Sequence, residues 1–276
     1  MASVADTGER RQTFWASAKP SATHPGWMPP ADRKEVFFDR YHDRGEEWYA
    51  GLFSGSNKYR ASGEITPTYF GNTKALERMK TFNQDMKLII ILRNPVDRAI
   101  SHYRMEVENA RINGSFESAI EKNTNLRHYS YYRKHLEEIG DKFSKQNVFL
   151  MIYEELFANA EATSEHLSAL GSFLDIDREL LQQLMLVDRV RASKGAPRWP
   201  WLVRRAKRIR RKLMDSDLEW AVDAAKRVGF SRNLIVKESR TVPVAEAERG
   251  RFRALFQEDV LATESYVGRS IAAWQQ

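Results

Sequence analysis

The chain of 276 residues contains no cysteine. Disulfide bonds, thiolate catalysis and cysteine-ligated zinc are therefore excluded. The six histidines show no His-x-x-x-His or similar ligand spacing, so we expect no metal site. No window approaches the roughly 18 apolar residues of a membrane span, and residues 1–11 lack the apolar core of a secretory signal. The sequence therefore shows no sign of a metal site, a membrane span or a secretory signal.

The net charge of +7 comes from one short stretch, residues 198–212, which we call the basic segment. It contains eight Lys or Arg residues and no acid, so the rest of the chain carries a net charge of −1. Trp199 and Trp201 stand near its start, and further apolar residues are interleaved along it. Three interpretations are open: a solvated helix face, a contact with an acidic membrane surface, or a contact with a polyanionic acceptor. No recognised nucleic-acid-binding motif accompanies the charge, so nucleic acid is not expected as a partner.

The clearest local pattern is a strand that turns at once into a helix. Residues 88–92 are a continuous apolar run, typical of a strand buried on both faces of a parallel sheet. Asn94 is a good N-cap, and Pro95 fits the first helical position. Arg93 then stands at the carboxyl end of the strand and Ser101 two turns into the helix, the region where open α/β folds hold anionic ligands. A guanidinium fork and a hydroxyl both donate to phosphate oxygens, so the stretch predicts a phosphate site.

Residues 88–101 also resemble the 3′-phosphate-binding motif of sulfotransferases that use 3′-phosphoadenosine 5′-phosphosulfate (PAPS). That motif is an apolar strand, an arginine, a turn with proline, and a serine eight residues after the arginine. Three further stretches resemble the same family, in the family's order. They are residues 24–49, similar to the acceptor-site entrance of bacterial and heparan-type sulfotransferases, residues 63–69, similar to a Gly-Glu-x-Thr/Ser-Pro-x-Tyr segment, and residues 258–274, similar to the closing helix and its terminal tryptophan.

The resemblance and the alternation of strands and helices predict the same architecture. We expect an α/β fold with a P-loop-like parallel sheet flanked by helices and a helical C-terminal portion. Residues 1–23 are expected to form an N-terminal arm, and residues 24–276 a single sulfotransferase-like domain. Buried strands are predicted at 88–92 and 147–153, with a short strand at 35–38. Helices are predicted at 72–82, after 95, at 115–122, 127–143, 159–173, 177–187, 200–213, 216–228 and 244–267.

The resemblance implies an enzyme that moves a sulfuryl group from PAPS to a hydroxyl or amine of a carbohydrate, glycolipid or small metabolite, without a metal. Arg93 and Ser101 would bind the 3′-phosphate. Glu35 matches the catalytic base of heparan-type relatives, or it pairs with a basic neighbour on the surface. Arg198 ends a stretch that resembles the loop closing over the nucleotide, or it merely begins the basic segment. Golgi relatives carry disulfides and a membrane anchor that this sequence lacks, which favours a cytoplasmic location, with peripheral attachment to a membrane as a further option.

One part of the family pattern is missing. Relatives carry a Lys-x-Gly-Thr-Thr loop whose backbone amides cradle the 5′-phosphate. The nearest stretch, residues 15–23, keeps Lys19 but has no glycine, and Pro20 removes an amide donor. Lys19 is therefore the candidate for the lysine that contacts the 5′-phosphosulfate. The gap keeps a second function open, that of a catalytically impaired homologue that binds nucleotide or a polyanion without turnover.

Glu35 provides the first test. If it is the general base, Glu35→Gln should retain nucleotide binding and lower turnover by about 10²-fold or more, because the amide cannot accept the acceptor's proton. Turnover and nucleotide affinity are measured on the same preparation. Relatives carry one more residue between this glutamate and the following Phe-Phe pair, so activity near the parent value would direct the search to Asp32 and Asp39.

Overall fold

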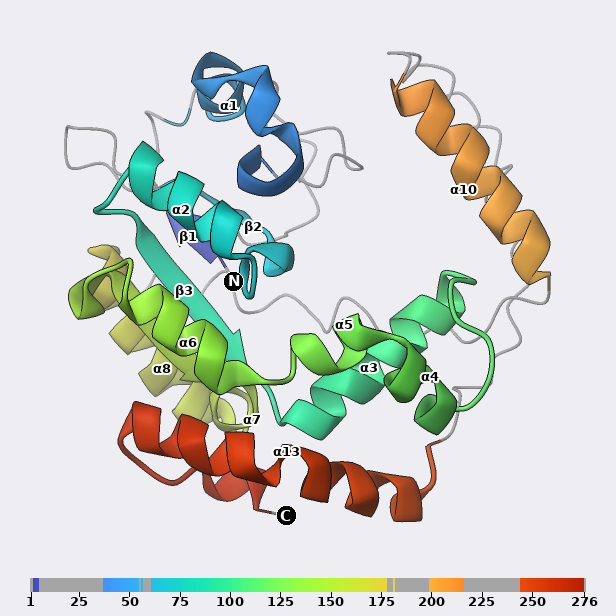
Figure 1. Ribbon diagram of the computed structural model, residues 1–276. Helices are drawn as coiled ribbons and strands as arrows, with labels where there is room; N and C mark the ends of the chain where they lie inside the picture. Colours follow the sequence, from blue (N-terminus) through green and yellow to red (C-terminus); the bar gives the residue numbers. More distant parts are fainter. Residues whose placement is uncertain are drawn as a thin grey trace. The chain divides into compact units, whose positions relative to one another are not determined.

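The computed structural model describes residues 2–4, 37–54, 56, 61–177, 181, 199–215 and 244–275. The chain divides into two compact units, which are drawn together in Figure 1. The first, here the sheet unit, comprises Met1–Asn94, Tyr131–Asp188 and Asp259–Gln276. The second, here the helical unit, comprises Pro95–Ser130 and Arg189–Glu258. Each unit is described by itself.

The sheet has four strands in the order β2-β1-β3-β4. Strands β3 (Lys87–Leu92) and β4 (Val148–Ile152) are parallel, with Leu88 opposite Val148 and Leu92 opposite Ile152. Strand β1 (Ala2–Val4) lies antiparallel to both β2 (Gly63–Ile65) and β3. The predicted α/β class is therefore confirmed, and both predicted strands are present, although β4 is fully buried only at Met151 and Ile152. The sheet as a whole is mixed, because β1 runs opposite to its three companions.

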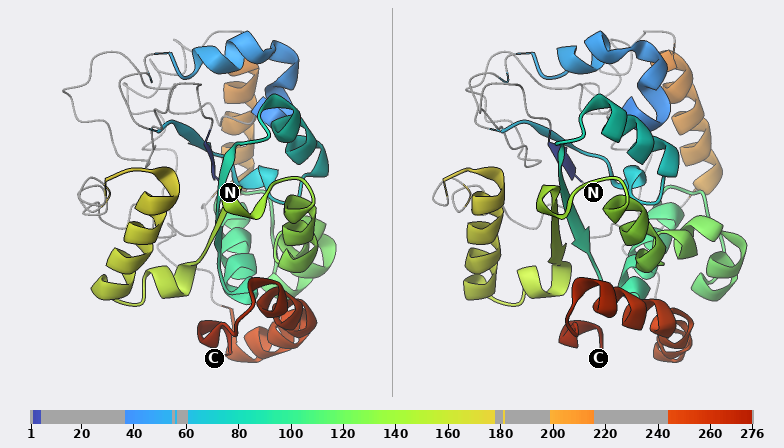
Figure 2. Two further views of the ribbon diagram at one scale, coloured as in Figure 1. Left: turned by 90° about the vertical axis from the view of Figure 1, so that its left-hand side faces the viewer. Right: turned by 60° about the vertical axis from the view of Figure 1, so that its left-hand side comes forward.

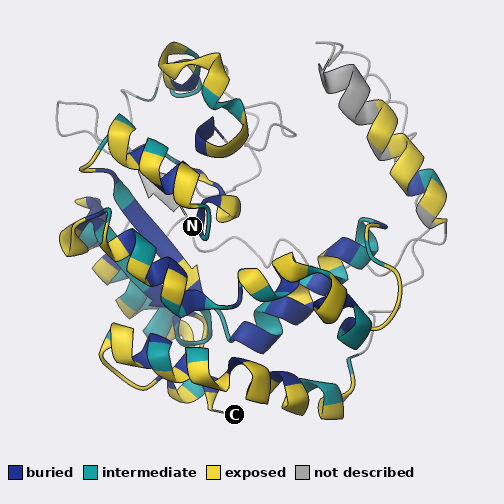
Figure 3. Ribbon diagram, viewed as in Figure 1, coloured by how far each residue is buried: buried dark blue, intermediate teal, exposed yellow. Residues whose placement is uncertain are grey.

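Helices cover both faces of the sheet. Figure 2 shows α8 (Ala160–Leu174) on one face, and α2 (Thr73–Phe82) and α6 (Tyr132–Gly140) on the other. Side chains alternate along a strand, so Ile89 packs against the cluster that contains Leu170 and Leu174 of α8, while Leu88 and Ile90 face the opposite way. Figure 3 shows β3 buried over most of its length. Burial on both faces explains why this strand is an unbroken apolar run.

Local sequence signals locate several helix ends correctly. The Asn72 side chain accepts a hydrogen bond from the Ala75 N–H at the start of α2, and Ser115 does the same for Ser118 in α4 (Phe116–Lys122). The helix predicted at 127–143 is instead two, α5 (Thr124–His128) and α6. The remaining short elements of the sheet unit are η1 (Phe37–Tyr41), η2 (His42–Arg44), α1 (Glu46–Gly51), η4 (Pro67–Tyr69), η5 (Lys145–Asn147), α7 (Tyr153–Leu156) and η6 (Ala272–Trp274).

The strand predicted at 35–38 is wrong for its described residues, because Phe37 begins the helical turn η1. Phe37 and Phe38 are consecutive, yet both are at most 1% exposed. The Phe37 ring stacks on Tyr49 with centroids 4.3 Å apart, and the Phe38 ring meets Tyr69 edge to face. A strand with one solvent face would send two neighbouring side chains to opposite sides, whereas a helical turn lets both enter one aromatic cluster.

The helical unit is built around α3 (Pro95–Glu108), whose predicted start at Pro95 is confirmed. One face of the helix is buried, with Ala99, Ile100 and Tyr103 at most 2% exposed. The partners of this face within the unit include α4. The Tyr103 ring lies 5.4 Å from that of Phe116 in α4, which in turn meets Phe252 of α13 (Glu246–Val267) at 4.8 Å. Helix α10 (Pro200–Asp215) contains most of the basic segment.

None of the helices in the described ranges combines the length and the apolar character that a membrane span requires.

The start of α6 is capped from a distant part of the sheet unit. Asp259 accepts hydrogen bonds from the N–H groups of Tyr132, at 2.7 Å, and Arg133, at 3.2 Å. Its own neighbour in sequence, Tyr131, makes no side-chain cap. Thr263 adds a longer contact to the same carboxylate, at 3.5 Å. The C-terminal helix therefore supplies the cap that the α6 sequence lacks.

Loss of this cap should be measurable. Asp259→Ala should lower the free energy of unfolding by about 1 kcal/mol, the usual cost of losing an N-cap acceptor. Asp259→Asn should lose less stability than Asp259→Ala, because the amide oxygen still accepts from one N–H group while the NH₂ group turns toward the other. Burial raises the pKa of the Asp259 carboxyl, so loss of the charge itself should cost little. Urea unfolding of the three proteins provides the comparison. Equal stability of the alanine variant and the parent would show that the cap contributes nothing.

Candidate functional site

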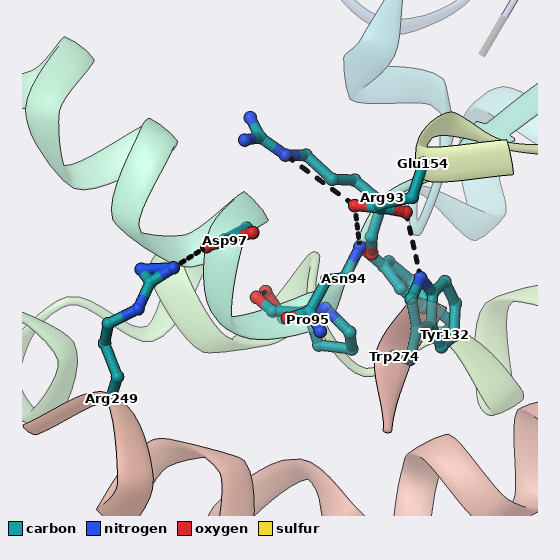
Figure 4. A network of polar contacts seen from close by, with 9 residues as sticks. Arg93, Asn94, Pro95, Asp97, Tyr132, Glu154, Arg249 and Trp274 are labelled. Atoms are coloured by element: carbon teal, nitrogen blue, oxygen red, sulfur yellow. Dashed lines mark hydrogen bonds and ion pairs between the residues drawn. The ribbon is translucent and has the colours of Figure 1, made fainter. Parts of the chain in front are cut away.

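Arg93 follows the last residue of β3, as the sequence predicted. Its guanidinium lies 5.1 Å from the centre of the Tyr153 ring, and its Nε lies 4.0 Å from Oε1 of Glu154. The side chain is 38% exposed, and among the described residues the buried Nε finds no hydrogen-bond partner. Figure 4 shows the two terminal nitrogens pointing away from Glu154. The guanidinium is therefore held at one end while its N–H groups remain available to an anion.

Glu154 joins three parts of the chain. It follows β4, and its Oε1 accepts a hydrogen bond from the backbone N–H of Asn94 at 2.8 Å. Its Oε2 accepts from the indole Nε1–H of Trp274 at 3.0 Å. The carboxylate thus binds the residue after Arg93 and the C-terminal segment at the same time (Figure 4).

The other side of the same peptide group is also held. The phenol of Tyr132 donates to the backbone oxygen of Arg93 at 2.7 Å. The Tyr132 ring lies 5.8 Å from that of Trp274, so Trp274 contacts both Tyr132 and Glu154. The C=O of Arg93 and the N–H of Asn94 belong to one planar peptide group, and side chains bind both of them.

Ser101 belongs to the helical unit. It is exposed in the second turn of α3, where its hydroxyl is open to solvent. The first turn of the helix carries Asp97, which pairs with Arg249. The next residue, His102, is partly buried, and burial together with the charge of Arg98 lowers the pKa of His102 to about 4, so the ring is neutral at pH 7. Ser101 thus offers an exposed hydroxyl, and its neighbour His102 adds no positive charge at pH 7.

The other predicted site residues, Lys19, Glu35 and Arg198, lie outside the described residues. The structure adds three residues that sequence reasoning did not assign to the site, namely Glu154, Tyr132 and Trp274. Glu154 carried a signal, because an acid directly after a strand parallel to β3 lies at the same sheet edge as Arg93. Nothing in the local sequence marked Tyr132 or Trp274 as partners of that edge.

A second buried polar cluster supports the segment that follows Glu35 in sequence. Glu64 is 2% exposed and accepts hydrogen bonds from Thr66 at 3.2 Å and from the Tyr49 phenol at 3.4 Å. Tyr69 accepts from the backbone N–H of Phe38 at 3.1 Å. Burial, reinforced by the charge of Glu64, raises the pKa of the Tyr69 phenol, which therefore stays protonated. These residues hold the Phe37–Phe38 pair in place.

Among the described residues, no group of three or more His, Cys, Asp or Glu side chains lies close enough together to hold a metal ion.

The chain is similar to known sulfotransferases. The family model described as "Sulfotransferase domain" matches residues 32–191, more than half of the chain. The human heparan sulfate glucosamine 3-O-sulfotransferase 3B1 is 30% identical over 170 residues, which cover 58% of this chain and 42% of that protein. The mouse heparan sulfate glucosamine 3-O-sulfotransferase 6 is 46% identical over 67 residues, covering 24% of this chain and 20% of that protein.

A membrane-associated sulfotransferase of Dictyostelium discoideum, kil1, is 34% identical over 87 residues, covering 30% of this chain and 18% of that protein. The chain thus spans less than half the length of these curated relatives. Among solved structures, a sulfotransferase from Alicyclobacillus acidocaldarius superposes with a TM-score of 0.58 at 20% identity, over 92% of this chain and 82% of that one. At this identity, the likeness to the Alicyclobacillus structure shows the fold alone.

Proposed function

The chain belongs to the sulfotransferase domain family, and on that premise we propose that it transfers a sulfuryl group from PAPS to an acceptor hydroxyl or amine. The observation that carries the proposal is Arg93, whose guanidinium stands at the end of a buried parallel strand with donors to spare. A guanidinium binds a phosphate through charge-assisted hydrogen bonds. We assign Arg93 to the 3′-phosphate of the donor, and Ser101 to the same phosphate on the strength of the motif.

PAPS supplies the activated sulfuryl group. The residues of the chain bind the donor, orient the acceptor and take the acceptor's proton. Transfer forms a bond between the acceptor oxygen and sulfur and breaks the bond between sulfur and the bridging phosphate oxygen. Positioning of the reactants lowers the entropic cost of such reactions, and cations stabilise the charge that develops. In this proposal Glu35 takes the acceptor's proton, while Lys19 and Arg198 contact the phosphosulfate end of the donor. No metal is assigned a role.

A carbohydrate, glycolipid or similar small hydroxyl acceptor suits the surface that follows Glu35. Exposed Arg44 lies 5.0 Å from the ring centres of both Tyr41 and Trp48, which forms a cationic and aromatic platform. Aromatic rings pack against the apolar faces of sugars, and a cation attracts acidic groups on them. The 3-O-sulfotransferase relatives act on a glucosamine of heparan sulfate by their names. These features support a saccharide acceptor.

Two departures from the family pattern support the second function, nucleotide or polyanion binding without turnover. Residues 15–23 lack the glycine of the 5′-phosphate loop. Ile65, where relatives often carry a lysine, is 56% exposed on β2, so an apolar group stands where the family places a cation. Titration with adenosine 3′,5′-bisphosphate beside a turnover assay separates the two functions, because the impaired homologue binds the nucleotide and transfers nothing.

The nucleotide assignment has a direct test. Arg93→Ala should weaken binding of adenosine 3′,5′-bisphosphate by about 10- to 150-fold, the effect of losing 1.5–3 kcal/mol of charge-assisted hydrogen bonding. Ser101→Ala should cost less, because a neutral hydroxyl is lost. Isothermal titration measures both affinities. Arg251→Ala, which removes a surface arginine paired with Glu117, serves as the matched control. Parent-like affinity in a folded Arg93→Ala protein would remove Arg93 from the site.

We further propose that the basic segment contacts an anionic surface, either an acidic membrane or a polyanionic acceptor. Trp199 is 46% exposed and Trp201 is 58% exposed, and the side chains of Arg205 and Arg208 are exposed as well. Large aromatic side chains beside arginines are the composition of helices that lie on anionic surfaces. The proposed location is the cytoplasm, with peripheral attachment to a membrane through this segment.

Charge removal tests this surface. Replacing Arg205, Arg208 and Arg211 together with glutamine should weaken binding to anionic vesicles or an acidic glycan and leave the melting temperature unchanged or slightly raised, because like charges repel within the segment. The loss should shrink toward 1 M salt, where the Debye length is about 3 Å. Arg204→Gln is the control, since Arg204 donates to the backbone oxygen of Ala110 at 3.2 Å. Undiminished binding of the triple variant to both partners at low salt would leave only a solvated helix face.

A further inference from the structure

The environment of Arg93 points to a residue that acts through it. Glu154 uses both carboxylate oxygens on neutral N–H donors, Oε1 on Asn94 and Oε2 on Trp274. Its contact with the Arg93 Nε, at 4.0 Å, is too long for a hydrogen bond. The carboxylate therefore attracts the guanidinium without consuming its donors. Because the carboxylate is only 21% exposed, water screens this attraction only in part.

Glu154 also restricts the backbone orientation at Arg93. The hydrogen bond to the N–H of Asn94 fixes one side of the Arg93–Asn94 peptide, and the Tyr132 phenol fixes the other. A planar peptide bound at both its C=O and its N–H cannot rotate without losing a bond. The direction of the Arg93 side chain from the strand end is thereby determined. Trp274 holds Glu154, and the indole lies against Tyr132, so the C-terminal segment supports both bonds.

Glu155, the residue after Glu154, anchors the C-terminal segment without contacting the peptide group that follows Arg93. Glu155 binds Arg269 of the same segment through two contacts, at 2.7 Å and 2.5 Å. In the described part of the chain, the Glu155 carboxylate pairs with Arg269 and not with Arg93 or Asn94. Two neighbouring glutamates thus fasten the same segment, and one of them also holds the peptide and the guanidinium of Arg93.

We propose that Glu154 is a positioning residue of the nucleotide site, which orients Arg93 toward the 3′-phosphate and is itself held by Trp274. The proposal rests on the proposed function, in which Arg93 binds that phosphate. The proposal adds Glu154 and Trp274, which are 120 positions apart in the sequence. Neither contacts the nucleotide, and both act on the selectivity of the site through Arg93.

The experiment measures selectivity for the 3′-phosphate. We define the selectivity ratio as the Kd for adenosine 5′-monophosphate divided by the Kd for adenosine 3′,5′-bisphosphate, two nucleotides that differ only in that phosphate. Glu154→Gln should lower the ratio by about tenfold, because the amide keeps one acceptor oxygen and turns an NH₂ group toward the second N–H donor. Trp274→Phe keeps an aromatic but smaller side chain, removes the N–H donor and should lower the ratio less. Glu155→Gln, the matched control, should change it by less than about twofold.

A double-variant cycle shows whether Glu154 acts through Arg93. In an Arg93→Ala background, Glu154→Gln should lower the selectivity ratio no further, because the group that it positions is gone. A ratio that stays constant or rises in Glu154→Gln overturns the proposal, since removal of a mere negative charge near the phosphate would raise it. An equal loss of affinity for both nucleotides, or a loss that persists without Arg93, also overturns it. If Glu154→Gln does not fold, Trp274→Phe decides by the same criteria.

Failure of the proposed function looks different. A selectivity ratio near one in the parent, or a ratio that survives Arg93→Ala, would show that Arg93 does not bind a 3′-phosphate, and both proposals would fall together. A high parent ratio that Arg93→Ala abolishes and Glu154→Gln leaves intact would overturn the role of Glu154 alone.

Discussion

The peptide group between Arg93 and Asn94 lies where the chain leaves a strand and enters a helix, and the rest of the candidate site depends on how its two polar groups are satisfied. Side chains do this, with the Tyr132 phenol on the oxygen and the Glu154 carboxylate on the N–H. Either group left buried without a partner would cost about 1–3 kcal/mol. The chain therefore recruits the end of β4, the start of α6 and the C-terminal segment to one point, and Asp259 caps α6 to keep Tyr132 there.

Buried polar groups are also satisfied by side chains around Glu64, elsewhere in the sheet unit. Glu64 is almost fully buried and accepts hydrogen bonds from two hydroxyl groups, at 3.2 and 3.4 Å. A carboxylate removed from water needs such donors to remain tolerable. Tyr69 stays protonated beside it and accepts the backbone N–H of Phe38. The turn that follows the candidate base is thus held in part by the Tyr69 phenol, which stays protonated.

How much the sequence reveals depends on how far apart the interacting residues are. The strand before Arg93 and the helices that begin near residues 72 and 115 follow from patterns within a few residues, and these predictions were confirmed. The expected helix at 127–143 is interrupted at Ser130, which is fully buried and donates to the backbone oxygen of Pro95. That bond spans 35 residues, and the bond from Trp274 to Glu154 spans 120, so no local periodicity could announce them. For the same reason the sequence located Arg93 correctly and missed the residues that hold it.

The 4.0 Å separation between Arg93 and Glu154 also explains how a carboxylate can favour an anion site. A direct hydrogen-bonded pair would have to be broken before phosphate could bind, and a free arginine would lose roughly 2 kcal/mol of rotamer entropy on binding. Glu154 avoids both costs, because its oxygens are occupied by neutral donors and its charge still attracts the guanidinium. The carboxylate repels the incoming phosphate to some degree, so the arrangement favours binding only while the entropy saved exceeds that repulsion. Its position beside the Nε, with the terminal nitrogens directed away, keeps the negative charge on the far side of the guanidinium from the ligand.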